Sequence, residues 1–280
     1  MSVISANPHR CRTEINHKNI QERMCKMKKR LITKRAGLLL VCLVSMSASV
    51  LAGQITVQVK SLASVEGVRF SPTWVGFHDG SFDTFDAGTP ASSQIEMLAE
   101  DGNSSGISGI FTGDKDGLIL GPGTPPIFMP GDIGSMTFDI DMSSDVYFSY
   151  LAMVVPSNDA FVGNDDPMAI QIVNNGTFTP ITFKVYGSMV WDAGTEVNDE
   201  VPVNTALLGQ TTPNTGVTEG ANIVLHNGHM VPGNILAAYP DADFTVPGYE
   251  IAEITIIPEP ATMSLMAIGA VTAIRKRKSK

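Results

Sequence analysis

Residues 135–155 read SMTFDIDMSSDVYFSYLAMVV, and this stretch decides the fold class. In SMTFDIDM, apolar and polar residues alternate, which is typical of a strand with one buried face. Phe138 and Ile140 therefore share one face, and Asp139 and Asp141 share the opposite face. VYFSYLAMVV is apolar over almost its whole length, which predicts a central strand.

Other segments of the chain have the same two kinds of pattern. QITVQVK (54–60) and ITFKVY (181–186) alternate, whereas EIAEITII (250–257) is apolar enough for a central strand. Turn signals such as PGD, NNG and TPN separate the strands, and the Gly- and Pro-rich residues 113–134 indicate a long loop. Without βαβ alternation or an internal repeat, the pattern predicts an all-β fold, an antiparallel β-sandwich.

One short helical insertion is expected within the β-sandwich. Thr89 is the predicted N-cap and Pro90 the first helical residue, followed by ASSQIEMLAEDG. Ile95, Leu98 and Ala99 fall on one face of this helix, and Gly102 ends it. The helix end also explains the adjacent acids at 100 and 101 without a catalytic role.

Residues 1–52 have the pattern of a leader with a signal peptide. KMKKRLITKR is basic, and AGLLLVCLVSMSASVLAG continues with an apolar run that ends in small residues. We expect cleavage after Ala52, and Met27 is the more typical start of such a leader than Met1. A membrane anchor is the competing interpretation, but the apolar run is shorter than the ~20 residues that span a bilayer.

Residues 258–280 form a second targeting segment. They contain the tripeptide Pro258-Glu259-Pro260, an apolar run over 261–274, and a basic tail rich in Lys and Arg. The segment closely resembles the PEP-CTERM sorting signal of Gram-negative bacteria. The resemblance implies an exosortase-type processing enzyme as partner, transient membrane association through this segment, and release to the cell surface or extracellular matrix. An ordinary tail anchor is the alternative.

The domain between these ends, residues 53–257, is strongly acidic. It contains four Lys or Arg residues and 25 Asp or Glu residues, a formal net charge of −21. Such a charge repels nucleic acid and favours cations, basic partners or high solubility. All three cysteines precede residue 53, so the domain has no disulfide available and a bound metal is a plausible source of stability.

Acidic residues near the ends of the predicted strands are the candidate metal ligands. They are Asp139 and Asp141 in TFDIDM, Asp159 in PSNDAFVG, and Asp192 with Glu196 in WDAGTE. Carboxylates gathered without cations raise one another's pKa values, and Ca²⁺ relieves this by accepting 6 to 8 oxygen ligands. The alternative is that these residues are separate, solvated turn residues.

Four motifs, in order and at matching spacing, resemble the spondin domain, the central module of F-spondin and mindin. They are RFSPTWVGFHDGSFDTFDAGTPAS, EMLAEDG, VVPSNDAFVG and WDAGTE, within residues 60–200. The resemblance implies a C2-like β-sandwich with a Ca²⁺ site at one end. The family's ligands fall on Asp159, Asp192 and Glu196, with a further ligand at Asp139 or Asp141. Asn158 and Ala160 depart from the family's motif beside Asp159.

These patterns favour a secreted adhesive or matrix protein with no enzymatic activity, whose partner is an extracellular polysaccharide or surface protein. A Ca²⁺-dependent carbohydrate-binding module is the first alternative, and a secreted hydrolase is the second. His226 and His229 in HNGHM are three residues apart but flank an Asn-Gly turn signal. We therefore expect an exposed turn there and not a helical zinc site.

Overall fold

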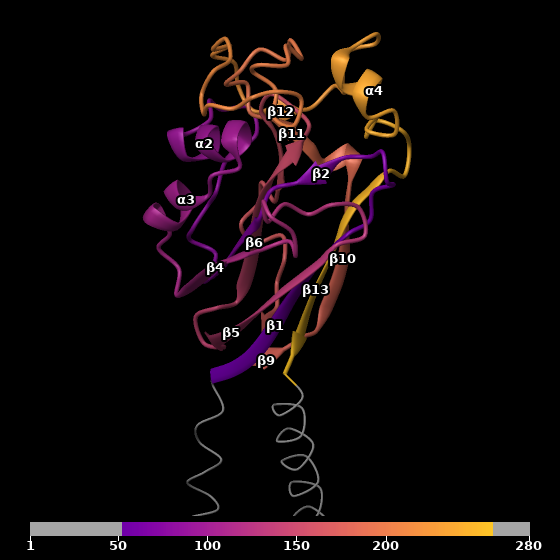
Figure 1. The fold of residues 1–280 in the computed structure, drawn as a ribbon. Helices are drawn as coiled ribbons and strands as arrows, with labels where there is room; N and C mark the ends of the chain where they lie inside the picture. Colours follow the sequence, from indigo (N-terminus) through magenta and orange to yellow (C-terminus); the bar gives the residue numbers. More distant parts are fainter. Residues whose placement is uncertain (1–51, 260–280) are drawn as a thin grey trace, which may run out of the picture. The chain divides into compact units, whose positions relative to one another are not determined.

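The computed structural model describes residues 52–259, so the predicted signal peptide and the apolar and basic parts of the sorting segment lie outside the described residues. Two antiparallel sheets pack face to face, with helices at one side (Figure 1). The predicted all-β sandwich is therefore confirmed. Among the described residues, no helix is both long enough and apolar enough to cross a membrane.

The first sheet has four strands, in the order β10-β13-β1-β5. Their bounds are Ala52–Ser61 for β1, Ile133–Asp141 for β5, Ile181–Tyr186 for β10 and Glu250–Pro258 for β13. In β1 the alternation predicted from QITVQVK is observed, since Ile55, Val57 and Val59 are buried. Phe138 and Ile140 of β5 are buried as well, and they face the second sheet's apolar strands in one hydrophobic core.

The second sheet follows the order β12-β11-β7-β6-β3-β4, with β2 paired to β6. The bounds are Arg69–Phe70 (β2), Thr73–His78 (β3), Lys115–Ile119 (β4), Tyr147–Val155 (β6), Ala160–Gly163 (β7), Val190–Asp192 (β11) and Val224–Leu225 (β12). β6 is central and buried almost throughout, as its apolar run predicted. Two small strands, β8 (Val173–Asn174) and β9 (Thr177–Phe178), form a separate hairpin.

The helices differ from the single insertion that the sequence predicted. The described residues contain α2 (Ser93–Asp101), α3 (Ser105–Ile110), α4 (Asn234–Ala238) and the 3₁₀ turn η1 (Gly187–Met189). Helices α2 and α3 cover the outer face of the second sheet, where a second hydrophobic cluster includes Trp74, Ile95 and Leu98. The predicted long loop of residues 113–134 is also wrong in part, because it contains β4.

The predicted N-cap of the first helix was wrong by one turn. Ser92 caps α2, because its side-chain oxygen accepts a hydrogen bond from Ile95 N at 3.3 Å. The Thr89 hydroxyl instead donates to the carbonyl of Asp86 at 2.7 Å. Pro90 forms a β-bridge with Asn222, so tertiary pairing keeps the residues before Ser92 extended. Gly102 ends the helix at φ 66°, as predicted.

The two ends of the sandwich carry different features. Helices α2 and α4 and strands β11 and β12 lie at the upper end in Figure 1, with the loops of residues 193–223. The start of β1 and the end of β13 lie side by side at the lower end, where Ile55 pairs with Pro258. The beginning and end of the described chain are therefore remote from the upper loops.

Candidate functional site

Three of the five predicted ligands lie near one another at the upper end of the sandwich. Asp159 ends the turn between β6 and β7, and Asp192 is the last residue of β11. Because β7 and β11 are antiparallel neighbours, Asp192 pairs with Ala160, the residue after Asp159. Glu196 follows four residues after Asp192, so strand pairing brings residues that are distant in sequence together.

Asp159 is the centre of this group and is fully buried, with 0% of its surface exposed. Its Oδ2 accepts hydrogen bonds from Thr195 N at 2.8 Å, Glu196 N at 3.1 Å and Thr195 Oγ1 at 3.2 Å. Its Oδ1 is buried and has no hydrogen-bond partner. One oxygen thus anchors the loop after β11, and the other is left without compensation for its burial.

Glu196 is in a similar position and is 2% exposed. Its Oε1 accepts a hydrogen bond from Asn158 Nδ2 at 2.8 Å, while its Oε2 is buried without a partner. The loop residue Gly216 lies against this carboxylate, since a Cβ atom there would come within 1.7 Å of Oε1. Asn158 therefore positions the second acid of the group.

Asp192 differs from these two acids because both of its oxygens accept hydrogen bonds. Gly194 N donates to Oδ1 at 2.8 Å, and Asn198 Nδ2 donates to Oδ2 at 2.8 Å. Asp192 is only partly buried. Its position shapes the turn at Gly194, whose φ is 66°.

Glu100 is a fourth acid of the site that the sequence interpretation assigned to the helix end. It lies at the end of α2, is 4% exposed, and is close enough to Glu196 for its charge to raise the pKa of that residue. We call Glu100, Asp159, Asp192 and Glu196 the acidic cluster. No signal in the sequence indicates this burial, because at 100° per residue Glu100 falls away from the face formed by Ile95, Leu98 and Ala99.

The acidic cluster is electrostatically strained because its charges are buried close to one another. Burial, and next the charge of Asp192, raises the pKa of Asp159 to about 7. Burial, with repulsion from Glu100 and Asp159, raises the pKa of Glu196 to about 7 despite the Asn158 hydrogen bond. The pKa of Glu100 is raised as well, chiefly by burial. Among the described residues, the two ion pairs are Lys115–Asp114 and Lys184–Glu250, and neither involves the cluster.

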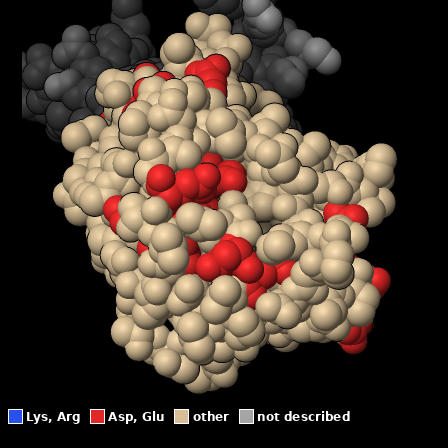
Figure 2. Space-filling view, turned by 90° about the horizontal axis from the view of Figure 1, so that it is seen from above, with Lys and Arg blue, Asp and Glu red and all other residues tan. Residues whose placement is uncertain are grey.

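The surface at the upper end of the molecule is acidic as well. Figure 2 looks down on this end and shows red acidic patches near its centre, and no blue Lys or Arg of the described residues is visible in that view. A strongly acidic face attracts cations over a distance set by the salt concentration. The site therefore favours positively charged ligands.

Asp139 and Asp141 are not brought to the acidic cluster. Both are exposed on β5, opposite Gln54 and Ala52 of β1, at the lower end of the first sheet. Asp139 and Asp141 do share one face of their strand, as predicted, but this strand belongs to the first sheet, whereas β7 and β11 beside the acidic cluster belong to the second sheet. Asp139 accepts a hydrogen bond from Gln54, and Asp141 accepts from Ser143. Within residues 52–259, no three carboxylate or histidine side chains already converge closely enough to hold a metal ion.

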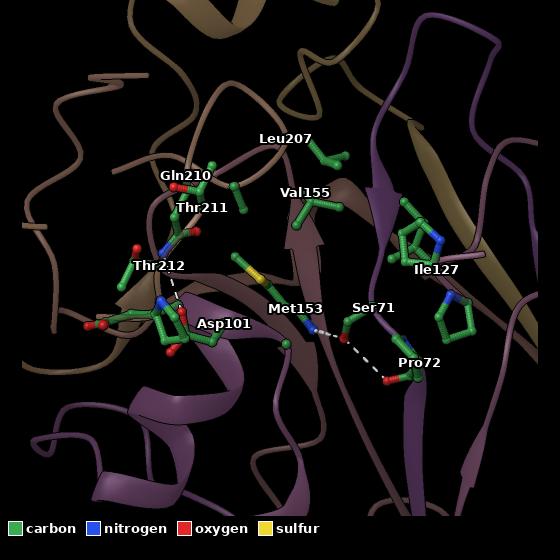
Figure 3. A pocket seen from close by; sticks show the side chains of 16 residues that line it. Ser71, Pro72, Asp101, Ile127, Met153, Val155, Leu207, Gln210, Thr211 and Thr212 are labelled. Atoms are coloured by element: carbon green, nitrogen blue, oxygen red, sulfur yellow. Dashed lines mark hydrogen bonds between the residues drawn. The ribbon is translucent and has the colours of Figure 1, made fainter. Parts of the chain in front are cut away.

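A pocket of about 370 Å³ lies next to the acidic cluster and shares Glu100 with it. Figure 3 shows Met153 and Val155 of β6 on its floor and Asp101 on its side, where Gln210 donates a hydrogen bond to Asp101 at 3.3 Å. Prolines and the loop of residues 206–213 complete its wall. The pocket therefore combines apolar surface with acids on one side.

The HNGHM segment lies partly buried near the same end, and not as the exposed turn that the sequence predicted. The rings of His226 and His229 pack against Phe244 at 5.2 and 4.9 Å between ring centres. His226 Nδ1 accepts a hydrogen bond from Gly228 N at 2.9 Å, so its buried Nε2 carries the proton and has no free lone pair for zinc. Burial lowers the pKa of His229 to about 4.

Comparison with protein families identifies one segment. The family model described as PEP-CTERM protein-sorting motif matches residues 257–278. The protein is thus exported across the inner membrane and processed for the cell surface or extracellular space by an exosortase, as the sequence predicted. A comparison with curated proteins finds no match. The matched segment lies outside residues 60–200, so the spondin resemblance stays a prediction.

Proposed function

We propose that the exported domain is a non-enzymatic, spondin-like adhesive module of the extracellular matrix, whose upper loops bind Ca²⁺ at the acidic cluster. The observation that carries this proposal is the pair of buried carboxylate oxygens without partners, Asp159 Oδ1 and Glu196 Oε2. Each such group costs about 1–3 kcal/mol or more when left unsatisfied. A bound cation would remove both costs at once.

The donor set suits calcium in its chemistry. Ca²⁺ accepts 6 to 8 oxygens in flexible geometry and combines carboxylates with backbone carbonyls and water. Asp159 and Glu196 would supply the free oxygens, and Asp192 or Glu100 would add charge. Because three acids do not already converge, backbone or water oxygens would have to complete the coordination. A bound ion would neutralise the buried charge and cross-link the turn before β7 to the loop after β11.

The partner that this end would contact is an extracellular polysaccharide or a surface protein. The pocket beside the cluster is lined by Pro125, Pro126 and Leu207 together with Gln210 and Thr212. Apolar surface with a few polar groups is the usual composition of a binding site. Sorting to the cell exterior puts extracellular polymer within reach of this surface.

The test uses the exported protein and the extracellular polymer of the exporting cells. Cosedimentation with the polymer should occur in Ca²⁺ and decrease in EDTA. Asp159→Asn should bind neither Ca²⁺ nor polymer as tightly as the wild type, whereas the exposed Asp241→Asn should behave as the wild type. Equal Ca²⁺ affinities of the two variants would refute the site. Release of new reducing ends from the polymer would instead support the hydrolase alternative.

A further inference from the structure

A second acidic pocket lies at the opposite end of β6 from the acidic cluster. It has a volume of about 310 Å³, and its lining includes His78, Asp79, Asp114 and Asp145. Since β6 has nine residues, its ends are about 26 Å apart at ~3.3 Å per residue. This Asp145 pocket, defined by these four residues, is therefore too far from Asp159 to share a ligand with it.

Asp145 is the buried acid of this pocket, with 0% of its surface exposed. Its Oδ2 accepts a hydrogen bond from the backbone N of Asp141 at 2.8 Å. That bond fixes the orientation of the carboxylate and leaves Oδ1, which is buried and has no hydrogen-bond partner. A fixed, desolvated carboxylate oxygen without a partner, in a residue that lines a cavity, calls for an explanation such as a bound ligand.

Backbone contacts hold a second acid beside Asp145. Asp114 N donates to the carbonyl of Phe77 at 3.2 Å, and Val146 N donates to the carbonyl of His78 at 3.0 Å. The loops that carry Asp114 and Asp145 are thus attached to consecutive residues at the end of β3. Gly113 permits this close approach, because a Cβ atom there would lie 2.5 Å from the Phe77 carbonyl oxygen.

The charges around the pocket leave the two acids poorly compensated. Burial, with repulsion from Asp114 and Asp141, raises the pKa of Asp145 to about 6, although the Asp141 amide opposes the shift. Lys115 Nζ lies 3.5 Å from Asp114 Oδ2, but both side chains are about 45% exposed, so this pair is weak. Asp79 adds a further exposed carboxylate at the rim.

His78 supplies neither a positive charge nor a metal ligand. Its Nδ1 accepts a hydrogen bond from Gly80 N at 3.1 Å, and its Nε2 lies 2.9 Å from Ser149 Oγ. Both ring nitrogens are engaged, and burial lowers the pKa of this imidazole. The pocket therefore presents oxygen ligands only, which is the preference of hard cations over zinc.

We infer that the Asp145 pocket is a second divalent-cation site, in which Asp145 Oδ1 and the Asp114 carboxylate bind a hard cation of the Ca²⁺ or Mg²⁺ class. Two carboxylates suffice when water fills the remaining positions, as is common for Mg²⁺. The open volume of the pocket has room for those waters. The site depends on none of the residues of the acidic cluster, and so it does not rest on the proposed function.

Calorimetric titration of Ca²⁺ and of Mg²⁺ into the chelator-stripped, exported protein tests this inference at 150 mM salt, where diffuse attraction is screened. Asp145→Asn and Asp114→Asn should each bind one ion fewer per protein molecule (one binding equivalent) than the wild type, for at least one of the two ions. Asp139→Asn, which removes an exposed acid of neighbouring β5, should retain every equivalent. Both pocket variants keep an acceptor oxygen, and circular dichroism in EDTA would verify that they are folded.

The variants also separate the two sites. In an Asp159→Asn background, the equivalent assigned to the Asp145 pocket should persist, and adding Asp145→Asn should remove it. If the proposed calcium site at the acidic cluster is wrong, the wild type would still lose one equivalent on Asp145→Asn. Folded Asp145→Asn and Asp114→Asn proteins with wild-type stoichiometry for both ions would overturn the inference.

Discussion

In the absence of divalent cations, the stability of the domain should fall as the pH rises from about 4.5 to 7.5. The largest single cause is Asp159, whose pKa is raised from its ordinary value of 3.8 to about 7 by burial and by Asp192. The raised pKa values of Glu196 and Asp145 act in the same direction. Across this window the folded protein retains a proton that the unfolded chain has released. The folded state therefore binds more protons, and the free energy of unfolding decreases with increasing pH.

The expected size of this loss comes from the pKa shift. The rise of the Asp159 pKa from 3.8 to about 7 corresponds to a loss of about 4 kcal/mol in the free energy of unfolding once the pH exceeds 7. Glu196, whose pKa is raised to about 7 by burial, acts in the same direction. Repulsion between Asp159 and Glu196 contributes to the raised pKa, so the effects of the two residues on stability are not additive. Against a typical total stability of 5–15 kcal/mol, this loss is large.

Urea unfolding of the exported protein in EDTA, followed by tryptophan fluorescence at several pH values, measures this effect. Asp159→Asn should reduce the slope of stability against pH, because the amide keeps an acceptor for the Thr195 and Glu196 backbone amides and cannot ionise. The part of the slope that comes from Glu196 and Asp145 should remain. Asp241→Asn, an exposed acid, should retain the wild-type slope. A wild-type stability that is constant or rises over this range would refute the reasoning, and so would an unchanged slope in Asp159→Asn.

Three further results are expected. Ca²⁺ at ~100 times its Kd should add about 2.7 kcal/mol of stability at pH 7, and an equal melting temperature in EDTA and in Ca²⁺ would contradict the calcium proposal. Ile95→Ala should cost about 2–5 kcal/mol in urea unfolding because Ile95 is fully buried under α2, whereas Met97→Ala, on the exposed face, should change stability by less than about 0.5 kcal/mol. Mass spectrometry of the exported protein should find an N-terminus at or near Gly53, and an intact leader would contradict the predicted cleavage.

Local periodicity in the sequence predicted the faces of individual strands well. The alternation in residues 54–60 and 137–142 correctly assigned buried and exposed faces to β1 and β5, because a strand's side chains alternate whatever it pairs with. Met136, which the same alternation places on the buried face, is exposed. The same reasoning could not say which strands would be neighbours. Asp139 and Asp141 were therefore grouped with Asp159 although they lie on different sheets.

The sequence interpretation missed the acids whose burial depends on contacts with segments that are distant in sequence. Glu100 resembles a residue at a helix end until the loop after β11 brings Thr195 against it. Asp145 comes after two serines in an ordinary turn pattern, and its turn is held against the end of β3 by the hydrogen bond from Val146 N to the carbonyl of His78. Burial of a charge depends on which loops meet, and no pattern within a single segment encodes that meeting.

The position of the sorting tripeptide constrains how processing and binding can coexist. Pro258 pairs with Ile55 inside β13, and Glu259 N donates to the carbonyl of Gln54 at 3.0 Å, so the motif begins within the folded sheet. These residues lie at the lower end in Figure 1, and the acidic cluster lies at the upper end. An enzyme that engages the tripeptide therefore leaves the proposed binding face uncovered. Cleavage close to Pro258 would remove pairing at the end of β13 but none of the contacts that hold Asp159, so processing should not abolish Ca²⁺ binding at the cluster.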